Sequence, residues 1–173
     1  MDERELPAAV RDAASRVRLL VLDVDGVMTD GRLHYGPGGA EFKSFHVRDG
    51  LGMKLAMRAG IEVAVISGRG GEAVERRLQE LGIRHALLRQ GDKRAALDRL
   101  LEEFGFRPGE VACVGDDTPD LAIMAPCGLG IAVADAHPEV LAAADWSTQT
   151  EGGRGAVREV CDLLVACRAA ERG

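Results

Sequence analysis

The fold is decided by one stretch of the chain, Arg18-Leu-Leu-Val-Leu-Asp-Val-Asp-Gly-Val-Met-Thr-Asp30. An unbroken Leu/Val run ends here at Asp23, and such a run predicts a strand buried on both faces of a parallel sheet. Asp23 and Asp25 therefore follow the carboxyl end of a strand, where Gly26 lets the backbone turn sharply. A purely structural acidic turn would have the same short pattern, so this stretch alone leaves the function open. An EF-hand is excluded, because Val27 stands where that loop needs a third oxygen ligand.

The composition indicates one ordinary globular domain spanning residues 1–173. Apolar residues make up 46% of the chain and aromatic residues only 3%, so aliphatic side chains must build the core. The net charge of −6 and the lack of a basic tract argue against nucleic acid as a partner. No run approaches the ~18 apolar residues of a membrane span, and the charged first residues are unlike a signal peptide, so no membrane association and a cytoplasmic location are expected.

The four cysteines lack the spacing of metal ligands. Cys113 falls in a predicted strand and Cys161 on an apolar helix face, so buried free thiols are expected. The other two are Cys127 and Cys167.

Apolar runs that alternate with helical patterns predict an α/β fold with a doubly wound parallel sheet. Besides the first strand, strands are expected at residues 62–66, 85–88, 111–114, 129–133 and around Trp146. Helices are expected at about 6–17, 49–59, 72–81, 92–104, 120–125, 155–168 and after Pro138. Ligands bind at the carboxyl ends of such strands, where Asp23, Ser67 and Asp116 would lie. Lys93 begins a helix that can reach the same edge.

A β-hairpin is predicted by two alternating segments, residues 32–35 and 41–46, on either side of Gly36-Pro-Gly-Gly39. Its apolar members exceed what a solvated flap needs, so the hairpin is expected to pack on another subunit. They are Leu33, Tyr35, Phe42 and Phe45.

Five aspartates at one edge of the sheet repel one another: Asp23, Asp25, Asp116, Asp117 and Asp120. Two like charges about 4 Å apart cost about 4 kcal/mol even at an effective dielectric constant near 20. A bound divalent cation or raised pKa values must offset this repulsion. Donors that are all oxygen favour Mg²⁺.

Three further motifs, in order along the chain, complete a recognisable set: Val65-Ile-Ser-Gly-Arg69, Lys93 and Val114-Gly-Asp-Asp-Thr-Pro-Asp120. With the first stretch they resemble the haloacid dehalogenase superfamily of aspartate-nucleophile phosphatases over nearly the whole chain. Two segments, Phe45-His-Val-Arg-Asp-Gly50 and Gly152-Gly-Arg-Gly-Ala-Val-Arg-Glu159, together with Ser67-Gly-Arg69, resemble the capless branch that acts on 3-deoxy-D-manno-octulosonate (KDO) 8-phosphate. The resemblance implies a Rossmann-like core without a cap domain and a role in lipopolysaccharide precursor synthesis.

The resemblance also implies roles for individual residues. Asp23 would be the nucleophile, Asp25 the acid and base, and Ser67 and Lys93 would bind the phosphoryl group. Mg²⁺ would be held by Asp23, the backbone carbonyl of Asp25, and Asp116. Substrate contacts would come from Asp25, His46, Val47, Arg48, Asp49, Gly50, Lys54, Arg69, Arg77 and Lys93.

Some assignments stay open at this point. Lys54 stands where the family often has Arg. Asp117 and Asp120 either support the metal or cap the following helix. Arg154 and Arg158 either close over the site or belong to a helix that merely ends the fold.

The segments from Asp30 to Ser67 and from Ser67 to Lys93 are both too short to hold a cap domain. A small sugar phosphate would therefore lie exposed to water in a single chain. The capless family is typically a homotetramer whose hairpins cover neighbouring sites, and the apolar hairpin fits that arrangement.

Two alternative functions remain from the sequence. One is a phosphatase for a nine-carbon ulosonate 9-phosphate, and the other is a non-catalytic subunit that binds phosphosugars.

Overall fold

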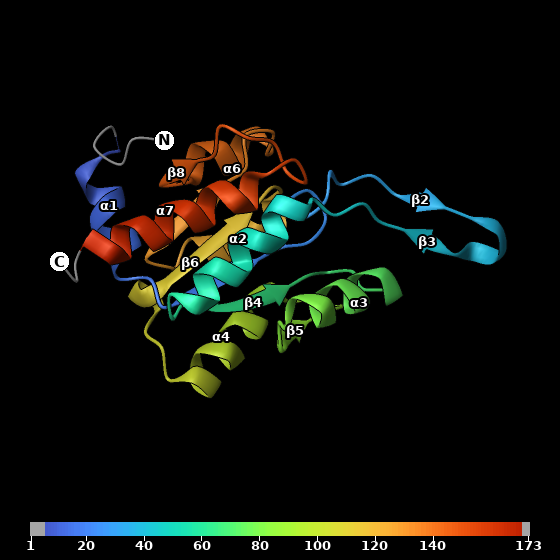
Figure 1. The fold of residues 1–173 in the computed structure, drawn as a ribbon, viewed down its shortest axis with the longest axis horizontal. Coiled ribbons are helices and arrows are strands. Elements are labelled where there is room, and N and C mark those ends of the chain that lie inside the picture. Colours follow the sequence, from blue (N-terminus) through green and yellow to red (C-terminus); the bar gives the residue numbers. More distant parts are fainter. Residues whose placement is uncertain (1–5, 171–173) are drawn as a thin grey trace.

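The computed structural model describes residues 6–170 and contains the predicted parallel sheet (Figure 1). The six-stranded sheet has the order β5-β4-β1-β6-β7-β8, and every neighbouring pair is parallel. Its strands are β1 (Leu19–Leu22), β4 (Glu62–Ile66), β5 (His85–Leu87), β6 (Val111–Gly115), β7 (Leu129–Ala132) and β8 (Trp146–Ser147). This confirms the doubly wound α/β fold class.

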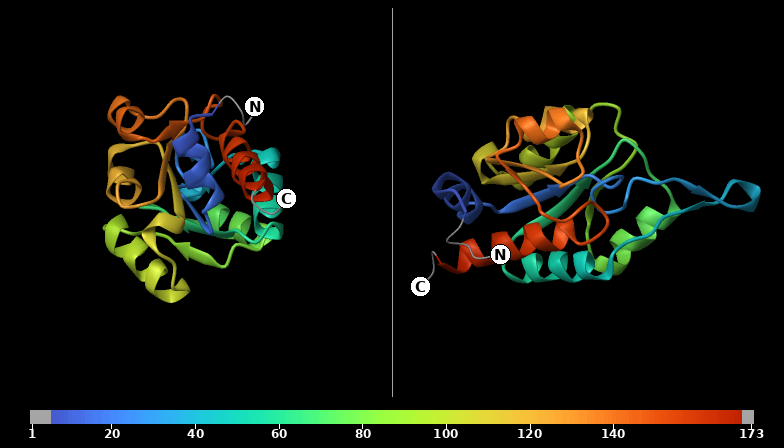
Figure 2. Two further views of the ribbon diagram at one scale, coloured as in Figure 1. Left: turned by 90° about the vertical axis from the view of Figure 1, so that its left-hand side faces the viewer. Right: turned by 90° about the horizontal axis from the view of Figure 1, so that it is seen from above.

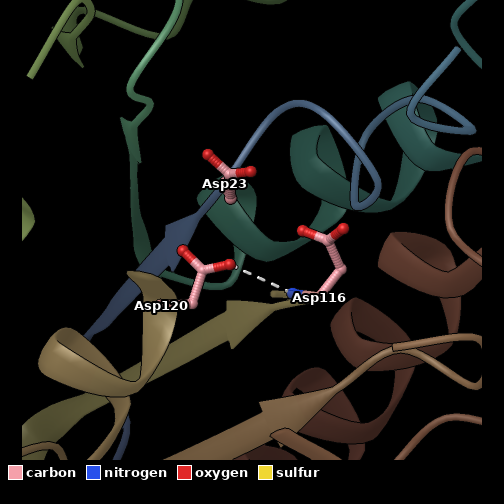
Figure 3. A group of neighbouring side chains, drawn as sticks. All are labelled: Asp23, Asp116 and Asp120. Carbon is pink, nitrogen blue, oxygen red and sulfur yellow. Dashed lines mark hydrogen bonds between the residues drawn. The ribbon is translucent and has the colours of Figure 1, made fainter. Parts of the chain in front are cut away.

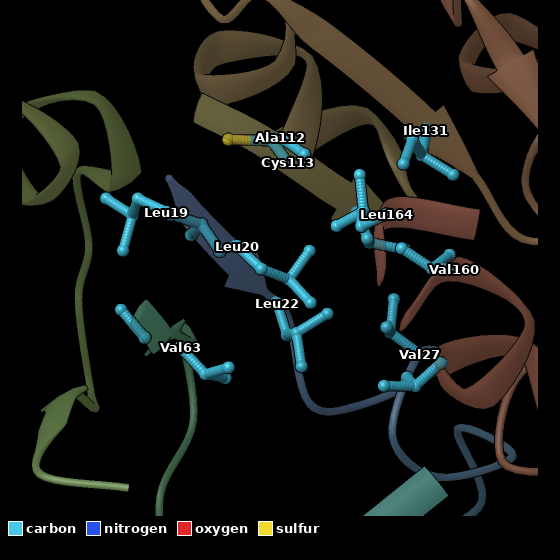
Figure 4. Close-up of a cluster of buried hydrophobic side chains, with 14 of the residues drawn as sticks. Leu19, Leu20, Leu22, Val27, Val63, Ala112, Cys113, Ile131, Val160 and Leu164 are labelled. Atoms are coloured by element: carbon cyan, nitrogen blue, oxygen red, sulfur yellow. The ribbon is translucent and has the colours of Figure 1, made fainter. Parts of the chain in front are cut away.

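Strand β1 lies at the centre, and all four of its side chains are buried, as the unbroken Leu/Val run predicts (Figure 4). Leu22 pairs with Val65 of β4 on one side and with Val114 of β6 on the other. This register brings the first residues after the three strands to one edge of the sheet, because parallel strands end on the same side.

Helices cover both faces of the sheet (Figure 2). The helices of the described residues are α1 (Ala8–Ser15), α2 (Val47–Arg58), α3 (Glu72–Leu81), α4 (Lys93–Phe104), α5 (Leu121–Met124), α6 (Pro138–Ala143) and α7 (Ala156–Ala170). Helices α2 and α7 pack side by side with α1 against α7, while α4 and α5 pack together on the opposite face. The apolar spacing predicts the buried faces correctly: α7, for example, buries Val157, Val160, Cys161 and Leu164.

The predicted hairpin is present and projects from the body of the protein (Figure 1). Strands β2 (His34–Tyr35) and β3 (Glu41–Phe42) are antiparallel and are joined across a 3-10 turn, η2 (Pro37–Gly39). Leu33, Tyr35 and Phe42 are exposed. Phe45 differs from the expectation, because it is partly buried and packs on the chain's own core.

Helix α2 begins two residues earlier than the sequence predicts. His46 caps it, since its Nδ1 accepts the backbone N–H of Arg48 at 3.3 Å. Asp49 therefore lies in the first turn and not at the helix start.

The remaining structural predictions concern cysteines, a cap and the membrane. Cys113, Cys161 and Cys167 are buried, and Cys127 is partly buried. Within residues 6–170, only the hairpin and α2 lie between β1 and β4, which leaves no room for a cap. Every helix in the same range falls short of the length and apolarity needed to cross a bilayer.

Candidate active site

A sharp turn after β1 sets Asp23 beside the loop that follows β6. Gly26 has a φ of +88°, and a Cβ at this position would lie only 1.9 Å from Asp116 Oδ2. The turn therefore requires glycine for both its backbone conformation and its space. Asp23 itself is 5% exposed, so its carboxyl group is held in a largely dry position at the sheet edge.

Three carboxyl groups converge at this edge: Asp23, Asp116 and Asp120 (Figure 3). One oxygen from each lies within 4.8 Å of the others, a spacing that can hold a metal ion. All of the donors are carboxylate oxygens, which suits a hard cation such as Mg²⁺. These residues fit the metal that the sequence predicts, with Asp120 as the third carboxyl group.

Asp120 also organises its neighbours. It is 1% exposed, and its Oδ2 accepts the backbone N–H groups of Asp116 at 3.1 Å and of Asp117 at 3.3 Å. Its Oδ1 accepts a hydrogen bond from Lys93. Asp117 is exposed and caps the short helix η4 (Thr118–Asp120) through the N–H of Thr118. Asp120 thus shapes the loop around the cluster, while Asp117 is a helix cap.

Lys93 supplies the positive charge of the cluster. Its Nζ lies 2.9 Å from Asp23 Oδ1 and 2.6 Å from Asp120 Oδ1, and its side chain is 10% exposed. Asp92 caps helix α4 by accepting the N–H of Ala95, so the helix begins at Lys93 as predicted. Burial lowers the pKa of Lys93, but the attraction of Asp23 and Asp120 outweighs burial and raises it overall.

Asp23 and Asp116 resist ionisation. Burial and then the charge of Asp120 raise the pKa of Asp23 to about 6, against the opposing effect of Lys93. Burial, followed by the charges of Asp23, Asp120 and Asp117, raises the pKa of Asp116 to about 7. A divalent cation would remove this penalty, because it favours the ionised carboxylates.

These shifts predict the pH dependence of stability. In the unfolded chain Asp23 and Asp116 lose their protons near the ordinary Asp pKa, whereas in the folded protein they keep them up to about pH 6 and pH 7. Because the folded state then binds more protons than the unfolded state, the free energy of unfolding falls as the pH rises toward 7. In EDTA, the Tm should be lower at pH 8 than at pH 5 by about 5 °C. Saturating Mg²⁺ should remove most of this difference. The control variant Asp116→Asn should flatten the EDTA profile, and an unchanged profile in that variant would contradict the assignment.

The Asp25 carboxylate does not join the cluster. It forms ion pairs with Lys43, through Oδ1, and with Arg69, whose Nε lies 3.5 Å from Oδ2. The metal role that the resemblance implies for Asp25 concerns its backbone carbonyl and not this carboxylate. Sequence reasoning gave Lys43 no role. The alternation of residues 41–45 could have indicated one, since it sets Lys43 on the face opposite the exposed Phe42.

Ser67 follows β4 and is 2% exposed. Its Oγ accepts the backbone N–H of Arg69 at 3.3 Å, so the residue also forms the turn at the strand exit. Ser67 borders a cavity of about 810 Å³ at the carboxyl edge of the sheet. The predicted site residues that line this cavity are Asp23, Asp25, Ser67, Arg69, Lys93, Asp116, Asp117 and Asp120. The other seven lining residues were not predicted as site residues: Gly31, Gly68, Gln90, Gly91, Asp92, Pro119 and Ala122.

The other predicted substrate contacts lie outside that cavity lining. Arg77 belongs to helix α3, and the other six cap or belong to helix α2: His46, Val47, Arg48, Asp49, Gly50 and Lys54. Val47, Arg48 and Lys54 are exposed, while the Arg77 guanidinium packs against Gly50. Asp49 points inward and accepts the N–H of Arg158 at 2.8 Å, which ties α2 to α7. Burial raises the pKa of Asp49.

The glycine-rich tail packs on the loop after β1. Gly153 donates its N–H to the carbonyl of Val27 at 3.0 Å, and a Cβ on Gly152 would lie 1.6 Å from the carbonyl oxygen of Gly26. Arg154 pairs with Glu151, and Arg158 pairs with Asp162. In this structure the tail therefore packs against the loop that follows β1, and both arginines pair within their own segment.

The fold and site define a class of enzyme. A model of the haloacid dehalogenase-like hydrolase family matches residues 86–160, which contain Lys93 and the Gly115-Asp116-Asp117 loop. The 3-deoxy-D-manno-octulosonate 8-phosphate phosphatase of Escherichia coli (strain B / BL21-DE3) is 50% identical over 158 residues, covering 91% of this chain and 84% of the relative.

Solved structures agree with the sequence relatives. The phosphatase of the same name from Yersinia pestis superposes with a TM-score of 0.94 at 45% identity, covering 97% of this chain and 91% of that one. The Moraxella catarrhalis phosphatase, in complex with a magnesium ion, a phosphate ion and KDO, gives a TM-score of 0.90 at 39% identity, covering 92% of both chains. The chain belongs to the 3-deoxy-D-manno-octulosonate 8-phosphate phosphatase family of haloacid dehalogenase-like hydrolases.

Proposed function

We propose that this protein is a Mg²⁺-dependent phosphatase that releases inorganic phosphate from KDO 8-phosphate, in lipopolysaccharide precursor synthesis. The observation that carries the proposal is the position of Asp23. It follows the central strand, is 5% exposed, and lies 2.9 Å from the Lys93 ammonium group within a three-carboxylate cluster. The family relatives that carry this name supply the substrate.

Asp23 attacks the phosphorus atom and forms an aspartyl phosphate as the bond to the sugar oxygen breaks. Lys93 holds the Asp23 carboxylate in place and neutralises charge on the phosphoryl oxygens, while Ser67 donates a hydrogen bond to them. Asp23, the Asp25 carbonyl and Asp116 would hold Mg²⁺, with support from Asp120. The bound ion supplies positive charge at the phosphoryl group.

Asp25 gives its proton to the departing sugar alkoxide. It then takes a proton from the water molecule that attacks the aspartyl phosphate, which releases phosphate and restores Asp23. The first step removes one proton from Asp25 and the second returns one, so a single carboxyl group serves as acid and then as base.

Arg69 and the group at the start of α2 would select the sugar. Arg69 borders the cavity, and a guanidinium binds a carboxylate through two parallel hydrogen bonds. Arg48, Arg77 and Lys54 would extend this positive surface when a neighbouring subunit closes the site.

The function is tested by phosphate release from KDO 8-phosphate and from a small aryl phosphate, with Mg²⁺ and after chelation. We expect turnover of both compounds in Mg²⁺, a large preference for the sugar phosphate, and loss of activity in EDTA. Tight binding of KDO 8-phosphate without any phosphate release would support the non-catalytic alternative.

The assembly is part of the proposal: a cytoplasmic homotetramer in which exposed hairpins cover neighbouring cavities. Leu33, Tyr35 and Phe42 are 43%, 66% and 58% exposed, and burying each such side chain contributes about 1.5–3 kcal/mol.

The double variant Tyr35→Ser, Phe42→Ser tests this arrangement while keeping Lys43 and Phe45 in place. We expect smaller assemblies in sedimentation and a fall of about tenfold or more in kcat/KM for the sugar phosphate, because water enters the site. Aryl phosphate hydrolysis should suffer less. Leu141→Ser is the control, since Leu141 is 38% exposed on α6, away from the hairpin. A fully active monomeric parent would contradict the arrangement.

A further inference from the structure

Lys43 is a buried cation from the hairpin that reaches the chain's own active site. It follows β3, and its side chain is 1% exposed. Its Nζ forms an ion pair with Asp25 Oδ1 and lies 3.1 Å from Glu41 Oε1. A lysine is almost never so buried without partners, because an ammonium group loses its hydration there. Burial lowers the pKa of Lys43, but the hydrogen bonds with Asp25 and Glu41 outweigh it and raise the pKa overall.

Arg69 completes a group of four charges. Its Nη2 lies 2.8 Å from Glu41 Oε2, and its Nε lies 3.5 Å from Asp25 Oδ2. The two cations therefore bind opposite oxygens of one carboxylate. The two cations differ in solvent exposure: the Arg69 side chain is 46% exposed, and the Lys43 side chain is 1% exposed. The Arg69 guanidinium is accessible to an anionic substrate, whereas the Lys43 ammonium is enclosed by its partners.

Lys43 does not border the cavity that Asp25 and Arg69 line. Its contact with the residues of that cavity is made through Asp25. An acid that protonates a leaving group needs a fixed direction, since small displacements of a reacting group lower the rate steeply.

We propose that Lys43 is the positioning residue that holds the Asp25 carboxyl group toward the leaving oxygen, so that the base of the hairpin is part of the acid–base machinery of its own subunit. The inference rests on the proposed phosphatase activity. It adds a second role to the hairpin, besides the proposed contact with a neighbouring subunit.

Lys43→Met tests the proposal, because Met keeps the length of the side chain and removes the charge. We expect kcat for KDO 8-phosphate to fall about 100-fold with little change in KM, since one acid–base group typically contributes 10²- to 10⁴-fold. Aryl phosphate hydrolysis should fall less than about fivefold, because a phenolate needs little protonation. Arg76→Met is the control: it removes an exposed cation, paired with Glu80, and should leave both rates unchanged.

A double-variant cycle separates positioning from a general structural effect. If Lys43 acts through Asp25, Lys43→Met should cost less than about threefold when added to Asp25→Asn. Full, additive losses in that background, or equal losses for the two substrates, would overturn the proposal.

If Lys43→Met does not fold, Lys43→Arg replaces it. Arg keeps the positive charge beside Asp25. The Lys43→Arg variant should therefore keep its ratio of KDO 8-phosphate activity to aryl phosphate activity within about threefold of the ratio in the parent enzyme. A ratio reduced as far as in Asp25→Asn would overturn the proposal. Absence of phosphate release by the parent enzyme would instead reject the proposed function itself.

Discussion

Asp23→Asn should abolish turnover while leaving the fold intact, with kcat at least about 10⁴-fold below that of the parent enzyme. The amide has nearly the size of the carboxyl group but cannot attack phosphorus, and it is a weaker ligand for Mg²⁺. The site should tolerate it, because burial and then the charge of Asp120 already disfavour the ionised form and raise the pKa of Asp23 to about 6. The change exchanges a costly buried charge for a neutral group of similar shape.

The measurement is phosphate release by the purified variant, with circular dichroism and sedimentation to establish its fold and assembly. KDO 8-phosphate should still bind in the presence of Mg²⁺, although more weakly. Turnover within about tenfold of the parent would contradict covalent catalysis by Asp23.

Lys93→Met should combine a loss of activity with a loss of stability. The variant leaves Asp23 and Asp120 without the cation that lies 2.9 and 2.6 Å from them. Removing one partner of a buried ion pair typically costs about 3–5 kcal/mol, and for a chain of this size each 1 kcal/mol lowers the Tm by about 2–4 °C. We therefore expect the Tm to fall by about 10 °C and kcat/KM to fall at least about 10³-fold.

Arg94→Met is the matched control for Lys93→Met. Arg94 is the next residue of the same helix, but it is exposed and pairs only with Asp98, one turn away. Such pairs contribute about 0.3–0.5 kcal/mol, so the control should retain both Tm and activity. Added Mg²⁺ should return part of the Tm lost in Lys93→Met, because it also neutralises the carboxylates. An unchanged Tm with activity within tenfold of the parent would show that Lys93 has neither role.

The sequence predicts the backbone of this site well, because its signals are local. Four consecutive apolar residues at Leu19–Leu22 require a strand buried on both faces, and the alternation of strands and helices then requires parallel pairing. Since parallel strands end on one edge, Asp23, Ser67 and Asp116 had to meet there. The position of Lys93 follows from the cap formed by Asp92.

The directions of individual side chains are harder to predict, because they depend on partners far away in the chain. Asp25 turns toward Lys43, 18 residues further on, and Asp49 turns toward Arg158, 109 residues further on. Nothing in the local spacing of Asp25 or Asp49 indicates these partners. Phe45 shows the same limit, since its burial depends on how the returning hairpin meets the core.

The central claim, that this site hydrolyses KDO 8-phosphate, is tested most directly by competition between two sugar phosphates in one solution. Equal concentrations of KDO 8-phosphate and a nine-carbon ulosonate 9-phosphate are incubated with enzyme and Mg²⁺, and both dephosphorylated sugars are quantified over time. The ratio of initial rates gives the ratio of kcat/KM values directly. The account predicts that the eight-carbon sugar forms at least about tenfold faster, and that neither product forms after chelation. Faster release from the nine-carbon compound, or equal release with and without Mg²⁺, would contradict it.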